Sequence, residues 1–265
     1  MSDVELKIKR SIEEADLVLI GLGTGFEYDW HDLLEDARYQ EIEKDIADRE
    51  EYRWSVPFLQ KMVLRSTADE RLMRAYEKLQ KLVNGKNYFL VSLCMDDYVY
   101  RLPFQEERVV TPCGGFRKMQ CDGNCSRILQ EVPENVYEDV LAYYQKKKQL
   151  NELHEPVCEK CGASLRFNQI GVTHYAEEGY LQEWDKYTKW LTGTVNRKVC
   201  VLELGAGMEY PSVIRFPFEK IVFYNKKAEL YRIHPFLYQI GEEIADRGMG
   251  VKADPVKFLG ENAKI

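Results

Sequence analysis

Two cysteine pairs carry the most specific chemical pattern in this 265-residue sequence. Cys121 and Cys125 stand four positions apart, Cys158 and Cys161 stand three apart, and 32 residues separate the pairs. Zinc prefers four thiolates in a tetrahedron, and two short Cys-x(2–4)-Cys turns supply two ligands each with little backbone strain. We therefore predict a structural zinc site, because four thiolates leave no coordination position open for a substrate. The alternative is a group of unpaired surface thiols.

A second pattern lies in the stretch from Asp16 to Gly25, where an unbroken apolar run ends in three alternate glycines. Such a run is typical of a parallel strand that is buried on both faces. The bare amides of a glycine-rich turn, with the start of the next helix, make a site of positive potential suited to a pyrophosphate. The dinucleotide fingerprint G-x-G-x-x-G is not met, because Phe26 occupies its third glycine position. The turn indicates either a phosphate site of another arrangement or a tight strand-to-helix turn without a ligand.

Polar and small residues follow two further apolar runs in the same manner. These runs are 88–94, which ends in Cys94 and is followed by Asp96 and Asp97, and 199–204, which is followed by Gly205, Ala206 and Gly207. Residues at the carboxyl ends of parallel strands face the ligand crevice of an open α/β sheet. We therefore predict that these residues belong to a site, although an Asp after a strand also serves as a helix cap.

The remaining sequence supplies the elements that must hold these residues in place. Apolar residues at helical spacing predict helices over 3–14, 133–149 and 180–191, and a charge-rich helical stretch over about 30–81 that Pro57 divides. Further apolar patterns predict strands at 221–224 and 230–233 and closing helices at 240–246 and 256–259.

The order of these elements predicts an α/β fold, a Rossmann-like parallel sheet with an inserted zinc-binding small module and a helical excursion. We expect the sheet-bearing domain to comprise residues 1–105 and 166–265, with the helical excursion at about 30–82. Residues 106–165 would form the zinc-binding module.

Composition and charge narrow the classes of function. Hydrophobic residues make up 45% of the chain and charged residues 31%, which is typical of a globular protein with a full core. The formal net charge of −7 argues against a nucleic-acid binder, whose phosphate-tracking surface needs an excess of Lys and Arg. No apolar run approaches a membrane span, and the N-terminus lacks the apolar core of a secretory signal. We therefore expect a cytoplasmic protein with no nucleic-acid or membrane partner.

Taken in order along the chain, these motifs resemble those of the sirtuin family, and in particular the macrodomain-linked (class M) sirtuins of bacteria. Gly21-Leu22-Gly23-Thr24-Gly25 stands where sirtuins have Gly-Ala-Gly-x-Ser, which cradles the NAD pyrophosphate. Ser92-Leu93-Cys94-Met95-Asp96 stands where they have Thr-Gln-Asn-x-Asp, whose Asn and Asp face the nicotinamide ribose. Cys113-Gly114 stands at the catalytic His-Gly, Gly205-Ala206-Gly207 replaces Gly-Thr-Ser, and Tyr224-Asn225 matches the Ile-Asn that meets the adenine ribose.

The resemblance implies NAD and zinc as cofactors and gives roles to individual residues. The cofactor-binding residues would be Gly21, Gly23, Thr24, Gly25, Asp96, Gly205, Ala206, Gly207 and Asn225, and the catalytic positions Cys94, Asp96 and Cys113. Class M sirtuins transfer ADP-ribose from NAD to a protein acceptor, apparently a lipoyl-carrier protein. The resemblance implies the same reaction and the same kind of partner for this chain.

Departures from the family pattern bear on the mechanism. In deacylating sirtuins a neutral His takes a proton from a ribose hydroxyl, and Cys113 stands in its place, although a thiolate is a better nucleophile than base. Lysine deacylation is therefore disfavoured. Deacylation nevertheless stays an alternative, as do NAD hydrolysis and an inactive module that binds NAD or ADP-ribose. We also hypothesise that Cys94 and Cys113 approach closely enough to sense redox state or to carry an ADP-ribosyl group; otherwise both are small fillers.

Overall fold

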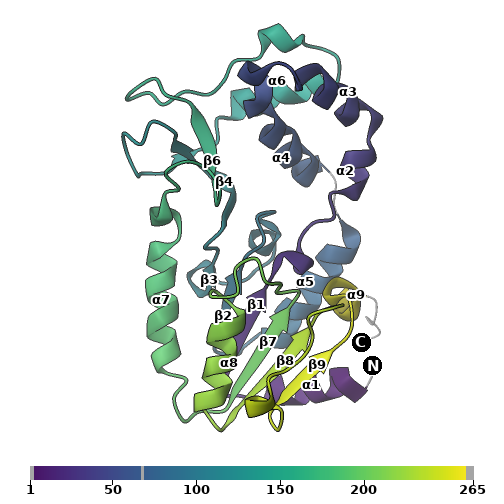
Figure 1. Ribbon diagram of the computed structural model, residues 1–265, viewed down its shortest axis with the longest axis vertical. Helices are drawn as coiled ribbons and strands as arrows, with labels where there is room; N and C mark the ends of the chain where they lie inside the picture. Colours follow the sequence, from purple (N-terminus) through teal and green to yellow (C-terminus); the bar gives the residue numbers. More distant parts are fainter. Residues whose placement is uncertain (1–2, 67–68, 261–265) are drawn as a thin grey trace. The chain divides into compact units, whose positions relative to one another are not determined.

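The computed structural model of the protein describes residues 3–66 and 69–260 and divides into two compact units (Figure 1). The first unit comprises Met1–Glu27, Glu70–Cys113 and Tyr180–Ile265, and the second comprises Tyr28–Asp69 and Gly114–Gly179. The first part of the helical excursion therefore groups with the cysteine-bearing segment. Its last helix, Glu70–Val83, groups with the sheet instead, because it packs on the other helices of that unit.

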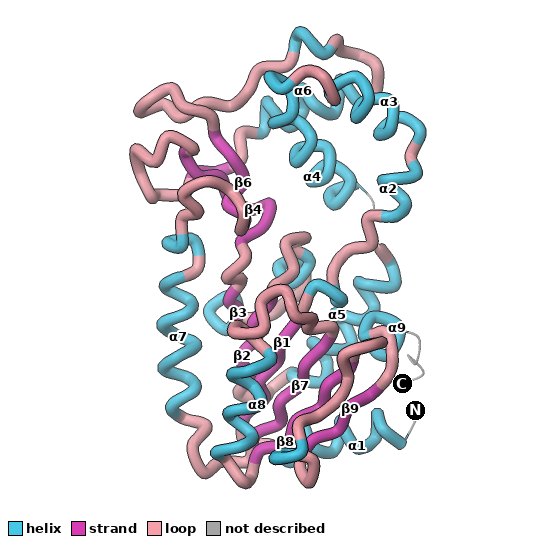
Figure 2. Tube along the Cα trace, in the orientation of Figure 1, coloured by secondary structure: helices cyan, strands magenta, loops and turns pink. Residues whose placement is uncertain are grey.

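The first unit is built on a six-stranded parallel sheet with the order β3-β2-β1-β7-β8-β9 (Figure 2). The strands are β1 Leu17–Leu22, β2 Tyr88–Ser92, β3 Val109–Val110, β7 Val199–Leu204, β8 Ala228–Ile233 and β9 Gly248–Val251. Strand β1 pairs with both β2 and β7, so that Ile20 is level with Leu90 and Leu202. The chain order reverses between β1 and β7. The carboxyl ends of these two strands therefore form the topological switch point, where doubly wound sheets bind their ligands.

Helices pack around this sheet. They are α1 Asp3–Glu14, α5 Glu70–Val83, α7 Leu181–Thr192, α8 Arg215–Tyr224 and α9 Pro255–Gly260. Helix α5 packs against α1 and α9, α8 packs against β7 and β8, and α7 packs against β3. Every residue of β1, β2 and β7 is buried, as expected for central strands of a parallel sheet. The predicted α/β class with a Rossmann-like sheet is confirmed.

The second unit combines a three-stranded antiparallel sheet, in the order β5-β4-β6, with short helices. Its elements are α2 His31–Glu35, α3 Ala37–Ile46, α4 Val56–Ser66, β4 Gly114–Cys121, β5 Gln130–Glu131, α6 Glu134–Tyr144 and β6 Leu165–Gln169. The Phe167 ring lies 4.9 Å from Phe58 and 5.2 Å from Phe116, which joins the helices to the small sheet. Pro57 stands in the first turn of α4, where a missing N–H costs nothing, so the predicted division at this residue is confirmed.

Short 3₁₀ helices occur at Thr24–Phe26, Glu50–Ser55, Tyr98–Arg101, Glu106–Arg108, Leu150–Glu152, Glu177–Gly179 and Glu242–Ile244. Within residues 3–66 and 69–260, no helix has the length and apolarity needed to span a membrane.

Predictions near the C-terminus needed correction. The predicted strand at 221–224 is wrong, because these residues form the end of α8. A short apolar run does not distinguish a strand from a helix, and here Phe218 and Val222, one helical turn apart, are both buried. The predicted helix at 240–246 is also wrong, since only a 3₁₀ helix forms there. Strand β9 was not expected, because Gly248 and Gly250 are atypical of a strand.

Candidate functional site

The two glycine turns meet at the switch point of the parallel sheet. The Gly23 amide donates to the Leu204 carbonyl at 2.8 Å, and the Gly25 amide donates to the Gly205 carbonyl at 3.0 Å. A Cβ atom on Gly23 would lie 2.2 Å from the Cα of Ala206. Gly205 has a φ of +66°, and a Cβ there would lie 2.6 Å from the Gly25 carbonyl carbon. The glycines are therefore required first by the close packing of one turn against the other.

Three other amides of these turns indicate a ligand-binding site. The described part of the chain offers no hydrogen-bond acceptor to the amides of Thr24, Ala206 and Gly207. Ala206 and Gly207 are nevertheless buried, and a buried N–H group without a partner costs free energy. Successive amides at a turn form a concavity that binds anions. The arrangement therefore fits an anion with several oxygens, such as a pyrophosphate, bound across both turns.

Gly21 lies before the first glycine turn, inside β1. A Cβ atom at this position would lie 2.6 Å from the Phe218 ring and 2.7 Å from the Ile214 side chain. Its missing side chain allows α8 to approach the strand closely. Gly21 thus acts on the turn through helix packing.

The end of β2 is tied to the first glycine turn. The Cys94 thiol donates to the carbonyls of Gly23 and Phe26, at 3.3 and 3.5 Å. Asp96 follows with 1% of its surface exposed and accepts the Tyr98 amide at 3.0 Å. The structure therefore brings Cys94 and Asp96 to the same edge of the sheet as the two glycine turns.

Glu27 also belongs to this group, although it was not predicted from the sequence. Its Oε1 atom accepts the Met95 amide at 3.3 Å, which places the carboxyl group beside the segment that carries Asp96. Burial, followed by the negative charge of Asp96, raises the pKa of Glu27 to about 8. The only available signal was its position, directly after the turn Thr24–Phe26. A carboxyl group whose pKa is raised toward neutrality beside other polar residues of a site is a candidate for acid–base chemistry.

The two thiols of this region are buried and neutral. Burial raises the pKa of Cys113 to about 12, with a further contribution from Glu27. Burial also raises the pKa of Cys94 well above its ordinary value, followed by the charge of Asp96. Since the thiolate is the reactive form of cysteine, neither thiol is activated as a nucleophile or as a base.

A buried ionic network supports the second glycine turn. The Glu203 carboxylate in β7 accepts from Arg232 in β8 at 2.6 and 3.0 Å. Arg215 at the start of α8 lies 3.3 Å from the same carboxylate and donates to the Ala206 carbonyl at 2.9 Å and to the Leu237 carbonyl at 3.0 Å. Arg215 therefore joins the second glycine turn to the loop that follows β8.

His234 and Asn225 lie at opposite ends of β8. His234 directly follows the strand, and its Nδ1 atom accepts the amides of Phe236 and Leu237 at 3.0 and 2.9 Å. Burial and the charge of Arg215 lower its pKa, so the ring is neutral at physiological pH. Asn225 precedes the strand, and its amide donates to the carbonyls of Thr194 and Arg197 at 2.8 and 2.9 Å. The structure does not bring Asn225 together with the glycine turns.

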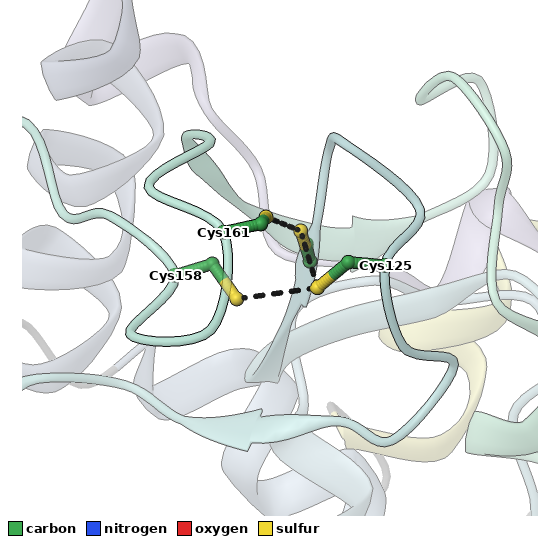
Figure 3. Close-up of side chains that lie close together, drawn as sticks. Cys125, Cys158 and Cys161 are labelled. Carbon is green, nitrogen blue, oxygen red and sulfur yellow. Dashed lines mark hydrogen bonds between the residues drawn. The ribbon is translucent and has the colours of Figure 1, made fainter.

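The four cysteines of the predicted zinc site do come together (Figure 3). Their sulfur atoms all lie within 4.8 Å of one another, with Cys121 3.4 Å from Cys161 and Cys125 3.6 Å from both Cys121 and Cys158. Zinc with four thiolates at about 2.3 Å requires sulfurs about 3.8 Å apart. The set therefore fits a tetrahedral zinc ion.

The two cysteine turns have the local geometry that ligation needs. Asn124 in the first turn and Gly162 after the second have φ values of 50° and 73°, which allow the chain to fold tightly around the sulfurs. The hydrogen bond from the Lys160 amide, followed by those from the Cys125 thiol and the Cys161 amide, lowers the pKa of Cys158 to about 6. This favours the thiolate form that binds the metal.

Comparisons with known proteins show what the chain is similar to. No family model matches it. It is 22% identical over 268 residues to a protein ADP-ribosyltransferase of Staphylococcus aureus, covering 93% of this chain and 83% of that protein. It is also 25% identical over 143 residues to a probable bifunctional ADP-ribose hydrolase/ADP-ribosyltransferase of Fusarium oxysporum, covering 52% of this chain and 24% of that protein.

Solved structures give the fold. A structure of Sir2 with a p53 peptide and NAD+ has a TM-score of 0.56 and 15% identity, and covers 98% of this chain and 96% of its own. A sirtuin structure concerned with substrate affinity has a TM-score of 0.52 and 16% identity, over 98% of this chain and 97% of its own. The chain therefore has the fold of sirtuins.

Proposed function

We propose that this protein binds NAD at the carboxyl edge of its parallel sheet and transfers ADP-ribose to a protein acceptor, in the manner of class M sirtuins. The observation that carries the proposal is the meeting of two glycine turns, with unpaired amides, at the switch point of a doubly wound sheet. The relatives named as ADP-ribosyltransferases and the Sir2 structure that holds NAD+ and a peptide support it.

The proposed binding roles follow from the geometry. The amides of Thr24, Ala206 and Gly207 would donate to the pyrophosphate, and Gly23, Gly25 and Gly205 would allow the two turns to form one cradle. Gly21 would contribute indirectly, because its lack of a side chain lets α8 pack closely against β1. Asp96 would orient the nicotinamide ribose. For the adenosine end we propose the segment after β8, beginning with His234, in place of Asn225, because His234 lies at the same edge of the sheet as the turns.

NAD bound here supplies an ADP-ribosyl group whose bond to nicotinamide can be broken and replaced. The chain's own residues would hold the phosphates, orient the ribose and exclude water beneath the turns. Cys94 would act by holding the first turn in place, since its thiol donates to two carbonyls of that turn. Zinc would have no part in the reaction, because four thiolates fill its coordination sphere.

Among the alternatives, lysine deacylation is the least supported. It needs a base at the position of Cys113, and the buried thiol there stays protonated at physiological pH. Hydrolysis of NAD requires the same site with water as the acceptor. A module that only binds NAD or ADP-ribose requires the glycine cradle alone.

The test is to incubate the purified chain with NAD+ and candidate acceptors, including a lipoyl-carrier protein, and to measure three quantities. These are NAD+ affinity by calorimetry, nicotinamide release, and the gain of one ADP-ribosyl mass on the acceptor. The proposal predicts all three. Binding without release would support the binding module, release without acceptor labelling would support hydrolysis, and absence of binding would exclude the whole proposal.

A further inference from the structure

The proposed transfer needs a proton acceptor, and most residues of this region are unsuited to the role. The thiols of Cys94 and Cys113 are buried and stay protonated. Of the four histidines of the chain, only His234 belongs to the sheet-bearing unit. Its Nδ1 atom is occupied by two backbone amides, and it follows β8, two strands away from β1.

Glu27 is the candidate for the proton acceptor that remains. It follows the first glycine turn directly, and the Met95 amide fixes its Oε1 atom beside the end of β2. The ionisable groups that act on it are the carboxyls of Asp96 and Asp97, while its own charge acts on the Cys113 thiol and the buried Tyr76 hydroxyl on α5. Each of these groups is acidic. A carboxylate at this place therefore faces neutral or negative neighbours and favours a cation beside it.

We propose that Glu27 is the catalytic base of this site, the group that takes the proton from the attacking atom of the acceptor. This inference rests on the proposed function. In the step, the acceptor's nucleophilic atom forms a bond to the anomeric carbon of the nicotinamide ribose. The bond from that carbon to the nicotinamide nitrogen breaks, and its electron pair leaves with neutral nicotinamide. The acceptor's proton passes to the Glu27 carboxylate and then to solvent, so that charge and atoms balance.

The surroundings of Glu27 suit this role. In the unliganded protein its raised pKa, about 8, keeps most of the group protonated at pH 7. The positive charge of a bound nicotinamide ring would favour the carboxylate, which is the form that accepts a proton. The rate should therefore rise with pH as Glu27 ionises and level off above the pKa of the complex.

The direct test compares Glu27→Gln and Glu27→Asp with the wild-type chain, and uses Glu77→Gln, an exposed change on α5 of the same unit, as the control. Loss of a general base should lower nicotinamide release by on the order of 100-fold or more in Glu27→Gln, with NAD+ affinity within about threefold of wild type. Glu27→Asp should recover part of the rate with a shifted pH profile. Glu77→Gln should match wild type.

A second readout does not depend on activity. Carbon-13 labelling of glutamate carboxyl groups should show one resonance that titrates near pH 8 in the unliganded wild type and is absent from Glu27→Gln. Wild-type release and an unchanged pH profile in Glu27→Gln would overturn the role of Glu27 while leaving the proposed function intact. Loss of NAD+ binding in Glu27→Gln would show that Glu27 binds NAD+, and would also overturn its role as the catalytic base. Absence of release from the wild-type chain would overturn both proposals.

Discussion

The glycines at the carboxyl edge of the sheet matter because they have no Cβ atom. Gly23 and Gly205 let one backbone turn lie directly on another, because a Cβ atom at either position would lie less than 3.0 Å from the backbone of the other turn, and a Cβ on Gly25 would be tight, at 3.0 Å from the Gly205 carbonyl oxygen. The same packing leaves the amides of Thr24, Ala206 and Gly207 without an acceptor among the residues that the structure describes. One set of glycines thus explains both the tight turn and the anion site, which the sequence presented as alternatives.

Replacing Gly205 by alanine tests this packing. Gly205 and Gly85 both have positive φ, but a Cβ on Gly205 would collide with Gly25, whereas one on Gly85 meets nothing within 4 Å. Gly85→Ala therefore serves as the control. Backbone strain should lower the free energy of unfolding by about 1–2 kcal/mol in both Gly205→Ala and Gly85→Ala. Only Gly205→Ala should also displace the first turn and weaken NAD+ binding, by about tenfold or more. Thermal unfolding and calorimetry measure the two effects, and equal NAD+ affinity in both variants would contradict the account.

Glu27 should give the stability of the protein a distinctive dependence on pH. The folded protein keeps a proton on Glu27 up to about pH 8, whereas the unfolded chain loses it near the ordinary value of 4.5. The free energy of unfolding contributed by this group therefore falls as pH rises from about 4.5 to about 8. Glu27→Gln removes this loss, so its stability relative to wild type should increase between pH 5 and pH 8. Denaturant unfolding at several pH values measures the difference, and a constant difference would contradict a raised pKa at Glu27.

The buried thiols lead to a prediction about reactivity. Because Cys94 and Cys113 are each about 2% exposed and protonated, a maleimide reagent should modify them slowly in the folded protein and rapidly after unfolding. Mass spectrometry of the labelled peptides gives the rates. Addition of NAD+ should not change them selectively. A large change at either cysteine would revive the hypothesis that these thiols sense redox state or carry an ADP-ribosyl group.

Among the elements, β7, β8 and α8 are held together by the buried charges of Glu203, Arg232 and Arg215. Glu203 and Arg232 are 0% and 1% exposed, in strands that are otherwise largely apolar. Their burial is tolerated because each charge is paired within this network. Arg215 also donates to the Ala206 carbonyl, so the network helps to position the second glycine turn.

Removing one partner of this network should be costly. Glu203→Ala removes the buried carboxylate that Arg232 and Arg215 share and leaves Arg232 only its half-buried partner Glu219, at 2.8 Å. Removing one partner of a buried ion pair costs about 3–5 kcal/mol. Glu203→Met combined with Arg232→Met should cost less than Glu203→Ala alone, because the most deeply buried cation is removed together with its carboxylate. Arg215 loses the same carboxylate in both variants but keeps its hydrogen bonds to the Ala206 and Leu237 carbonyls. Glu70→Ala, which breaks an exposed pair with Arg74, should change stability by at most about 0.5 kcal/mol. Denaturant unfolding of the four proteins checks the order, and a Glu203→Ala variant as stable as Glu70→Ala would refute it.

The elements also show where sequence patterns suffice. Strand β7 was predicted at its observed bounds, Val199–Leu204, because a fully buried run followed by glycine has few other interpretations. The run 221–224 was misassigned because four apolar residues fit a strand or the end of a helix equally well. That error also affected the site. With 221–224 in a helix, Asn225 lies at the amino end of β8, and the residue after the strand is His234.

At the scale of the whole molecule, the sequence placed the glycine turns at 21–25 and 205–207 and the segment around Asp96 on one edge of a sheet, and the structure brings them together there. It could not identify Glu27. Whether an acidic side chain after a turn points into the protein or into solvent depends on contacts such as the one with Met95, which is distant in sequence.

The zinc site should stabilise the second unit by joining two distant segments. Metal analysis should find one zinc ion per chain, and Cys125→Ser should lose it. Chelation should then increase hydrogen exchange in 114–179 more than in the strands 199–204 and 228–233 of the first unit. Equal protection with and without the chelator would count against a structural metal.

The most direct test of the central claim is a crystal structure of the protein with NAD+ bound. The account predicts pyrophosphate oxygens within hydrogen-bond distance of the amides of Thr24, Ala206 and Gly207, with the nicotinamide ribose next to Asp96. A nucleotide bound away from both glycine turns, or no nucleotide at millimolar NAD+, would contradict it.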